Sequence, residues 1–213
     1  MSYPLRHLLP GRRLCHAQGG DLRSRDQGRT GATGRCDYRA AGRRRGVKAV
    51  GARYRIGVLT LSDKGARGER IDESGHILRA MVDTLGEVVC YQVIADEVAE
   101  IVRVLRDWSD VEGLDLILTT GGTGLSPRDV TPEATRVVID REVPGMAEAM
   151  RQASLAKTPH AMLSRAVTGL RGATLIINLP GSPRGVRENL AVLLPALPHA
   201  LAKLKGDPAD CAR

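Results

Sequence analysis

Residues 114–135 read LDLILTTGGTGLSPRDVTPEAT, and their pattern decides the fold. The largely apolar run Leu114–Leu118 has the length of a buried strand, and it leads into a loop with three glycines, TTGGTG at 119–124. The triplet Thr131-Pro132-Glu133 then offers an N-cap, a first-turn proline and an acid near the positive end of a helix dipole. The stretch therefore predicts a strand, a glycine loop and a helix in succession.

The sequence on either side repeats this alternation of strands and helices. Further short apolar runs predict strands at residues 56–61, 88–94 and 175–179. Apolar residues at helical spacing predict helices over residues 77–85, 101–108, 145–156 and 197–204, with another from Ser182-Pro183 that Pro195 interrupts. Strands that alternate with helices are typical of an α/β fold, here with a mostly parallel sheet and helices on both faces.

The positive charge of the chain is concentrated at its N-terminal end. The 213 residues include 32 Lys+Arg and 24 Asp+Glu, a net charge of +8. Residues 1–53 hold 13 basic and three acidic residues, a net +10, which leaves residues 54–213 at −2. Nine glycines and few large apolar side chains predict that residues 1–53 form a disordered extension. The alternatives are an arginine-rich arm that binds phosphates and a transit peptide.

Composition argues against several classes of protein. No apolar stretch approaches the ~18 residues of a membrane span, and the first residues lack the apolar core of a secretory signal. The four scattered cysteines form no C-x-x-C pair, which argues against a zinc site or a dense disulfide framework and favours a reducing cytoplasm. Without Phe and with one Trp, the chain offers few platforms for stacking bases, so nucleic acid is not an expected partner.

Polar residues follow four of the predicted strands at the point where each strand ends. Ser62-Asp63 follows the first, Asp96 the second, the glycine loop with Asp129 the third, and Pro180-Gly181-Ser182 the last. In open α/β sheets ligands bind beyond the carboxyl ends of the strands, so we expect these segments to meet at one rim. The glycine loop offers backbone N–H groups to a phosphate, and two carboxylates beside it suit Mg²⁺.

Each of these features also has a purely structural interpretation. The glycine loop can be a tight turn, because it matches neither the Walker A pattern nor G-x-G-x-x-G. Asp129 can be a turn residue that bonds nearby backbone amides, Asp96 can cap a helix that begins at Glu97, and Ser182 can cap the next helix. Cys90 lies in an apolar strand and the histidines carry no catalytic signature, so covalent catalysis is disfavoured.

Seven motifs occur in the order found in proteins of molybdenum-cofactor biosynthesis. They are Ile56–Asp63, Thr119–Gly124, Arg128–Thr135, Asp140–Gly145, Met150–Leu155, Leu163–Arg165 and Asn178–Pro183. On these motifs the chain resembles the molybdopterin adenylyltransferase group (MogA/MoaB type), which is related to the G domain of gephyrin. The resemblance covers residues 54–206, which we expect to form a molybdopterin-binding domain. This leaves the extension at residues 1–53, which the resemblance does not cover, and a tail at 207–213.

The resemblance implies a three-layer α/β/α sandwich, usually a homotrimer, that binds molybdopterin and Mg-ATP in the cytoplasm without a membrane partner. Catalytic members of the group transfer AMP from ATP to the terminal phosphate of molybdopterin and release pyrophosphate. Adenylylated molybdopterin then passes to the molybdate-insertion enzyme. The resemblance thus implies Mg²⁺ as the metal, and ATP and molybdopterin as the substrates, with Arg128 or Arg165 adding positive charge near the phosphates.

The functional residues of the group carry over by position. Its two functional aspartates, which would also hold the metal, correspond to Asp96 and Asp129. Its phosphate-binding loop corresponds to Gly121, Gly122, Thr123 and Gly124, and its pterin-facing loop to Pro180, Gly181 and Ser182. Ser154 and Ser164 match positions near the pterin, and Ser62 joins the set because it follows the first strand.

Two other functions remain open at this point. A protein of the same family could hold molybdopterin without adenylylating it, although the pair of aspartates favours the catalytic branch. A protein of another class could bind nucleic acid through the arginines of residues 1–53, with an affinity that falls steeply with salt.

Overall fold

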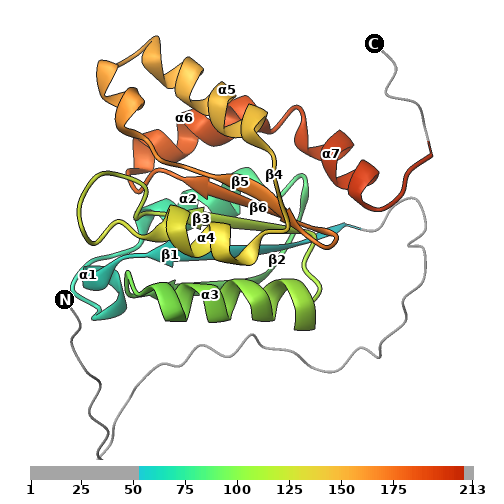
Figure 1. Cartoon of the computed structure of the whole chain (residues 1–213), viewed down its shortest axis with the longest axis horizontal. Helices are drawn as coiled ribbons and strands as arrows, with labels where there is room; N and C mark the ends of the chain where they lie inside the picture. Colours follow the sequence, from blue (N-terminus) through green and yellow to red (C-terminus); the bar gives the residue numbers. More distant parts are fainter. Residues whose placement is uncertain (1–52, 209–213) are drawn as a thin grey trace, which may run out of the picture. The chain divides into compact units, whose positions relative to one another are not determined.

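The computed structural model describes residues 53–208, in which six strands form one sheet. The strands lie in the order β2-β1-β3-β6-β5-β4 (Figure 1). Their bounds are β1 Tyr54–Leu61, β2 Gly86–Ile94, β3 Leu116–Thr120, β4 Arg141–Glu142, β5 Thr168–Arg171 and β6 Thr174–Leu179. The first four strands in this order, β2, β1, β3 and β6, run parallel, whereas β5 and β4 are antiparallel to their neighbours.

Helices cover both faces of the sheet, which makes the domain a three-layer α/β/α sandwich (Figure 1). Their bounds are α1 Asp63–Ala66, α2 Glu73–Met81, α3 Val98–Arg106, α4 Thr131–Val138, α5 Pro144–Leu155, α6 Pro183–Leu193 and α7 Leu197–Leu204, with a π-helical turn η1 at Asp107–Val111 and a 3₁₀ turn η2 at Pro159–Leu163. One apolar core joins the sheet to α2, α5, α6 and α7, and the other joins it to α3, η1 and α4.

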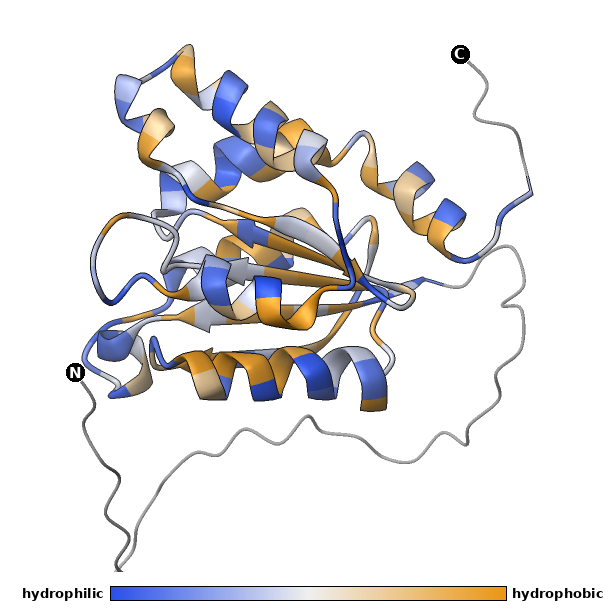
Figure 2. Cartoon of the chain, viewed as in Figure 1, coloured by the Kyte–Doolittle hydropathy of each residue, from blue (hydrophilic) through white to orange (hydrophobic). Residues whose placement is uncertain are grey.

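The central strands are buried because both of their faces are covered. β3 and β6 have no exposed residue, as expected for short, continuous apolar runs. The amphipathic helix α3 buries Ile101, Val104 and Leu105 against the sheet, an apolar stripe that can be followed in Figure 2. Trp108, in the turn after α3, completes that core with 1% of its surface exposed.

The fold class and the principal strands and helices predicted from the sequence are confirmed, although α2 begins and ends four residues earlier than predicted, at Glu73 and Met81. Two further corrections are needed. The antiparallel strands β4 and β5 were not predicted, because one has only two exposed residues and the other contains a glycine. Helix α4 begins at Thr131 itself, so the prediction that Thr131 is the N-cap is wrong by one position. Ser182 does cap α6, since its side chain accepts a hydrogen bond from the Gly185 N–H.

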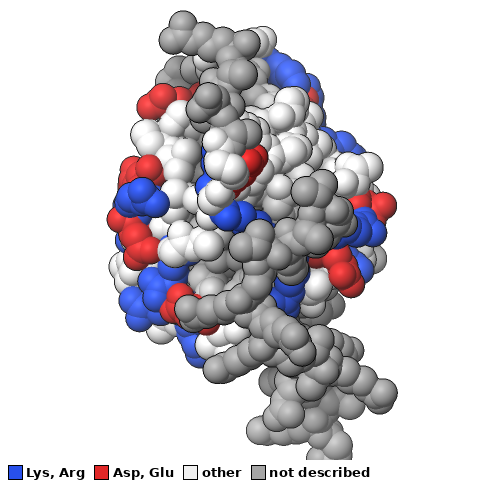
Figure 3. Space-filling view, turned by 90° about the vertical axis from the view of Figure 1, so that its right-hand side faces the viewer, with Lys and Arg blue, Asp and Glu red and all other residues white. Residues whose placement is uncertain are grey.

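The remaining predictions about the ends of the chain lie outside the described residues. This holds for the extension expected at residues 1–53, except its last residue, and for most of the tail at 207–213. Among residues 53–208, no helix has the length and apolar character that crossing a bilayer requires. On the face shown in Figure 3, positive and negative side chains of the described residues are interspersed, in line with the near-neutral charge of residues 54–213.

Candidate functional site

The carboxyl ends of the parallel strands lie in register along one edge of the sheet. Thr60 of β1 pairs with Thr120 of β3, which in turn pairs with Leu179 of β6. The loops that follow these strands, together with the loop after β2, therefore meet at this edge. They enclose a cavity of about 340 Å³. Seven of the predicted site residues line it: Ser62, Asp96, Gly121, Gly122, Asp129, Gly181 and Ser182.

We call this space the acidic cavity, because carboxylates dominate its charged residues. Asp72, Glu73, Asp96 and Asp129 line it against a single cation, Arg70. Such an excess of negative charge repels a bare phosphate and attracts a phosphate that carries a metal ion.

A second cavity of about 470 Å³ lies on the other side of the glycine loop. The other predicted residues line it, namely Thr123, Gly124, Ser154, Ser164 and Pro180, and Ser182 lines both cavities. Its charged residues include Arg151, Lys157, Arg184 and Glu188, so we call it the cationic cavity. The structure thus places all the predicted site residues, but in two adjoining cavities rather than one.

The glycine loop forms the boundary between the two cavities because of its backbone conformation. Gly121 and Gly122 have φ values of +102° and +61°, which residues other than glycine rarely adopt. A Cβ on Gly121 would lie 2.3 Å from the Leu61 carbonyl oxygen, and one on Gly122 would lie 2.3 Å from Thr131 Oγ1. The Thr131 hydroxyl donates to the Gly121 carbonyl at 2.9 Å, which fixes the loop to the start of α4.

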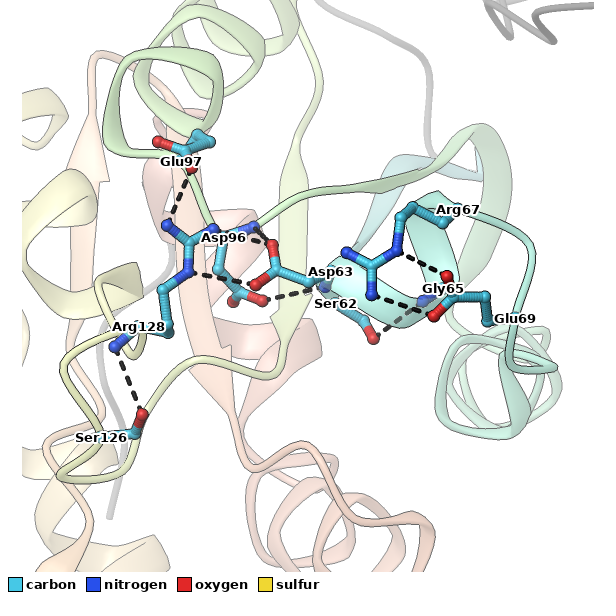
Figure 4. A network of polar contacts seen from close by, with 9 residues as sticks. All are labelled: Ser62, Asp63, Gly65, Arg67, Glu69, Asp96, Glu97, Ser126 and Arg128. Carbon is cyan, nitrogen blue, oxygen red and sulfur yellow. Dashed lines mark hydrogen bonds and ion pairs between the residues drawn. The ribbon is translucent and has the colours of Figure 1, made fainter.

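Asp96 faces the start of α1 instead of capping the helix that follows it. Its Oδ2 accepts a hydrogen bond of 3.1 Å from the Asp63 N–H, and the Asp96 N–H donates to Asp63 Oδ1 at 3.2 Å (Figure 4). Helix α3 begins at Val98, with Glu97 at the N-cap position and no side-chain cap. The interpretation of Asp96 as the cap of α3 is therefore wrong.

The surroundings of Asp96 disfavour its negative charge. Burial raises the pKa of this carboxyl above its ordinary value, and the charges of Asp63 and Asp129 raise it further, against the opposing effect of the Asp63 N–H and Arg128. A cation bound between Asp96 and Asp129 would relieve this repulsion.

Asp129 has the structural role proposed for a turn residue and also lines the acidic cavity. Its Oδ2 accepts a hydrogen bond of 2.8 Å from the Ser126 N–H, within its own loop. A Cβ on Gly124 would lie 2.9 Å from the same oxygen, so the glycine at this position lets the carboxylate approach the loop. The two interpretations of Asp129 are thus compatible.

Two arginines that the sequence placed near phosphates are bound to protein groups instead. Arg128 forms ion pairs with Asp63 and Glu97. Arg165 pairs with Glu133 and donates to the backbone carbonyls of Gly124 and Asp129. Neither arginine is among the residues that line the acidic cavity. Both hold the loop between β3 and α4 in place.

Asp72 is a cavity residue that the sequence reasoning missed. Its carboxylate accepts hydrogen bonds from the Thr60 hydroxyl at 2.5 Å, from the Tyr91 hydroxyl at 2.6 Å and from the Gly75 N–H at 2.9 Å. Burial and this carboxylate raise the pKa of Tyr91. The available signal was an acidic residue just before the helix start at Glu73, which is the usual place of an N-cap.

Comparison with known proteins identifies the family. Residues 57–199 match the family described as "Probable molybdopterin binding domain". The chain belongs to this family. The chain is similar to a molybdopterin adenylyltransferase of Helicobacter pylori, with 41% identity over 158 residues that cover 71% of this chain and 88% of the relative. The crystal structure of the molybdopterin biosynthesis enzyme MoaB from Thermus thermophilus is 57% identical, covers 74% of this chain and 99% of that one, and has a TM-score of 0.68.

Two other relatives of the chain are much longer proteins. Gephyrin of Dictyostelium discoideum is 44% identical over 164 residues, which cover 72% of this chain and 23% of gephyrin. The cinnamon protein of Drosophila melanogaster is 43% identical over 160 residues, 26% of its length. The chain therefore spans about a quarter of these two relatives but most of the bacterial adenylyltransferase.

Proposed function

We propose that the chain is a molybdopterin adenylyltransferase of molybdenum-cofactor biosynthesis. It transfers AMP from Mg-ATP to the terminal phosphate of molybdopterin and releases pyrophosphate. The observation that carries this proposal is the pair of adjoining cavities of opposite charge, one acidic and one cationic, with a glycine loop between them. Such a pair suits the joining of two anionic substrates, of which one arrives with a metal ion.

The charges assign one substrate to each cavity. The cationic cavity, with Arg151, Lys157 and Arg184 against Glu188, suits the terminal phosphate and polar pterin of molybdopterin. The acidic cavity, with Asp96 and Asp129, suits the triphosphate of ATP as its magnesium complex. The two reacting phosphates then meet at the glycine loop, whose backbone N–H groups can donate to their oxygens.

The donor set of the acidic cavity fits Mg²⁺. No group of three or more His, Cys, Asp or Glu side chains in residues 53–208 forms a complete metal site. Two carboxylates suit Mg²⁺, which commonly takes one or two protein carboxylates and completes its shell with phosphate oxygens and water. Bound Mg²⁺ supplies neutralisation of the triphosphate charge. Asp96 and Asp129 would hold it.

The residues perform the reaction by positioning rather than by covalent chemistry. An oxygen of the molybdopterin phosphate attacks the α-phosphorus of ATP. The bond from this phosphorus to the oxygen that joins the α- and β-phosphates breaks, and pyrophosphate leaves with that oxygen. The loop at Gly121–Gly124 fixes the α-phosphate between the two cavities, and the cationic side chains hold the attacking phosphate against its own repulsion from ATP. No proton needs to be removed from a phosphate oxygen that is already ionised.

Pyrophosphate release by the purified full chain tests this proposal. With molybdopterin and Mg-ATP we expect one pyrophosphate for each adenylylated molybdopterin, and no release when molybdopterin is omitted. Molybdopterin binding without pyrophosphate release would instead identify the chain as a binding protein of the same family.

The cationic cavity makes a separate prediction about substrate affinity. Replacing both Lys157 and Arg184 by alanine should raise the KM for molybdopterin several-fold, because two exposed charges contribute about 1 kcal/mol together, and should leave the KM for ATP unchanged. Arg187→Ala is the matched control, since Arg187 is an exposed residue of the same helix as Arg184 but does not line the cavity. Steady-state kinetics with each substrate varied in turn measures both KM values. An equal change in the two KM values would contradict the assignment of molybdopterin to the cationic cavity.

The proposal extends to the oligomeric state, the compartment and the partner enzyme that the family implies. We propose a homotrimer that acts in the cytoplasm and passes adenylylated molybdopterin to a molybdate-insertion enzyme. Nucleic-acid binding through residues 1–53 has no support in the described residues, and the domain boundaries at 53/54 and 206/207 stay predictions. Sedimentation of the full chain tests the trimer.

A further inference from the structure

Arg128 connects three segments at the carboxyl edge of the sheet. It lies in the loop after β3, and its guanidinium donates to Asp63, the first residue of α1, through Nε at 3.1 Å and through a terminal nitrogen at 2.8 Å. The other terminal nitrogen donates to Glu97, in the loop after β2, at 2.8 Å. Figure 4 shows the guanidinium between the two carboxylates.

This arrangement engages both oxygens of the Asp63 carboxylate. Oδ1 accepts from Arg128 and from the Asp96 N–H, and Oδ2 accepts from Arg128 Nε. The Asp63 N–H then donates to Asp96 Oδ2. A continuous path of hydrogen bonds therefore runs from Arg128 through Asp63 to Asp96.

The orientation of Asp96 depends on this path. With Oδ2 bound to the Asp63 N–H, Oδ1 faces the glycine loop, where a Cβ on Gly122 would approach it to 3.0 Å. Asp96 also lines the acidic cavity. Without the guanidinium, the carboxylates of Asp63 and Asp96 would repel each other at close range. Asp63 would also become available as a competing metal ligand.

We propose that Arg128 is a positioning residue that prepares Asp96 to bind the magnesium ion of Mg-ATP. It acts through Asp63, which it holds away from the metal, and it does not touch either substrate. This inference rests on the proposed function, because it assumes that the acidic cavity takes a metal–nucleotide complex. An ordinary surface ion pair would have no such effect on metal affinity.

Metal binding can be measured without turnover. Electron paramagnetic resonance of Mn²⁺ reports its affinity for the full chain in the presence of α,β-methylene-ATP, in which the bond broken by adenylyl transfer is blocked. We expect Arg128→Ala to weaken Mn²⁺ binding about tenfold. Arg128→Lys should recover part of the loss, since a lysine can pair with one carboxylate but cannot donate to Asp63 and Glu97 at once as the guanidinium does. In turnover, Arg128→Ala should raise the Mg²⁺ concentration for half-maximal pyrophosphate release by a similar factor and leave the KM for molybdopterin unchanged.

Arg67→Ala is the matched control. Arg67 is as exposed as Arg128, at 57% against 52% of the side chain, forms a two-pronged pair with Glu69, and places positive charge near Asp63 without bonding to it. This variant should bind Mn²⁺ as the parent chain does. A similar weakening in Arg67→Ala would reduce the effect to general charge and overturn the proposal.

Two further results would also overturn it. One is parental Mn²⁺ affinity in Arg128→Ala. The other is a raised KM for ATP at saturating Mg²⁺ with unchanged Mn²⁺ binding, which would make Arg128 a phosphate ligand. Should Arg128→Ala fail to fold, Arg128→Gln replaces it, because a neutral amide cannot neutralise the Asp63 carboxylate, and the same tenfold loss is expected. Absence of pyrophosphate release by the parent chain would contradict the proposed function, whereas the Mn²⁺ comparison would still decide the role of Arg128.

Discussion

Asp129→Asn and Asp96→Asn are each expected to lower the turnover number of adenylyl transfer by about 10²–10⁴-fold, because each removes a negative charge that faces the metal–nucleotide complex. Each substitution removes the negative charge of the side chain but can keep its hydrogen bonds. In the Asp129→Asn variant, the amide oxygen can still accept from the Ser126 N–H as the Asp129 carboxylate does. An amide at position 96 can likewise accept from the Asp63 N–H.

The measurement is pyrophosphate release at saturating substrates, with thermal unfolding of each variant as the check on folding. Asp83→Asn is the control: Asp83 is a surface aspartate with 79% of its side chain exposed and does not line either cavity. It should turn over at the parental rate. Full turnover in both Asp96→Asn and Asp129→Asn would contradict the assignment of the acidic cavity to Mg-ATP.

The sequence predicted the edge of the sheet at which the acidic cavity lies, because parallel strands end at the same edge. The segments around Ser62, Asp96 and Asp129 are far apart along the chain, yet each follows a strand that the apolar pattern predicts. Once β1, β2 and β3 are parallel neighbours, their loops must meet. This part of the site follows from the fold alone.

The division into two cavities depends on side-chain packing that the apolar pattern does not encode. The cationic cavity includes residues of α5, η2 and α6, and η2 is a short 3₁₀ turn without a helical repeat. Asp72 was missed for a similar reason, because its partners Thr60 and Tyr91 lie on strands distant in sequence. The sequence shows which residues are polar but not which of them share a hydrogen bond.

The same limit explains why the sequence wrongly suggested Arg128 and Arg165 as phosphate ligands. As cations beside a glycine loop, Arg128 and Arg165 look like phosphate ligands. Their carboxylate partners Asp63 and Glu133 lie 65 and 32 residues away, so only the folded chain reveals that the guanidinium groups are already bound. Lys157 and Arg184 are also paired, both with Glu188, but they line the cationic cavity, whereas Arg128 and Arg165 line neither cavity. The prediction of positive charge at the phosphates therefore shifts to Lys157 and Arg184.

Gly121→Ala is expected to destabilise the fold by about 2–5 kcal/mol and to lower adenylyl transfer at temperatures where the protein remains folded. Two costs add up: a φ of +102° is unfavourable for alanine, and the new Cβ would lie 2.3 Å from the Leu61 carbonyl oxygen. This carbonyl cannot easily move, because Leu61 is buried at the end of β1 and pairs with Ile94 of β2.

Gly172→Ala separates the two costs. Gly172 also has a positive φ, of +54°, in the turn between β5 and β6, but a Cβ there meets no atom within 4 Å. It should lose only the backbone preference, about 1 kcal/mol, and keep full activity. Urea unfolding of both variants gives the difference, and equal midpoints would show that the contact with Leu61 carries no cost.

The loss of activity in Gly121→Ala has its own structural cause. The Leu61 carbonyl immediately precedes Ser62 and Asp63, so any shift that relieves the contact moves the residues that orient Asp96. On the other side, a Cβ on Gly181 would lie 3.2 Å from the Gly121 Cα, which places the loops after β3 and β6 in direct contact. Displacement of Gly121 therefore disturbs both cavities at once, and we expect the KM values for ATP and molybdopterin to rise together, unlike those of the Lys157 and Arg184 variant.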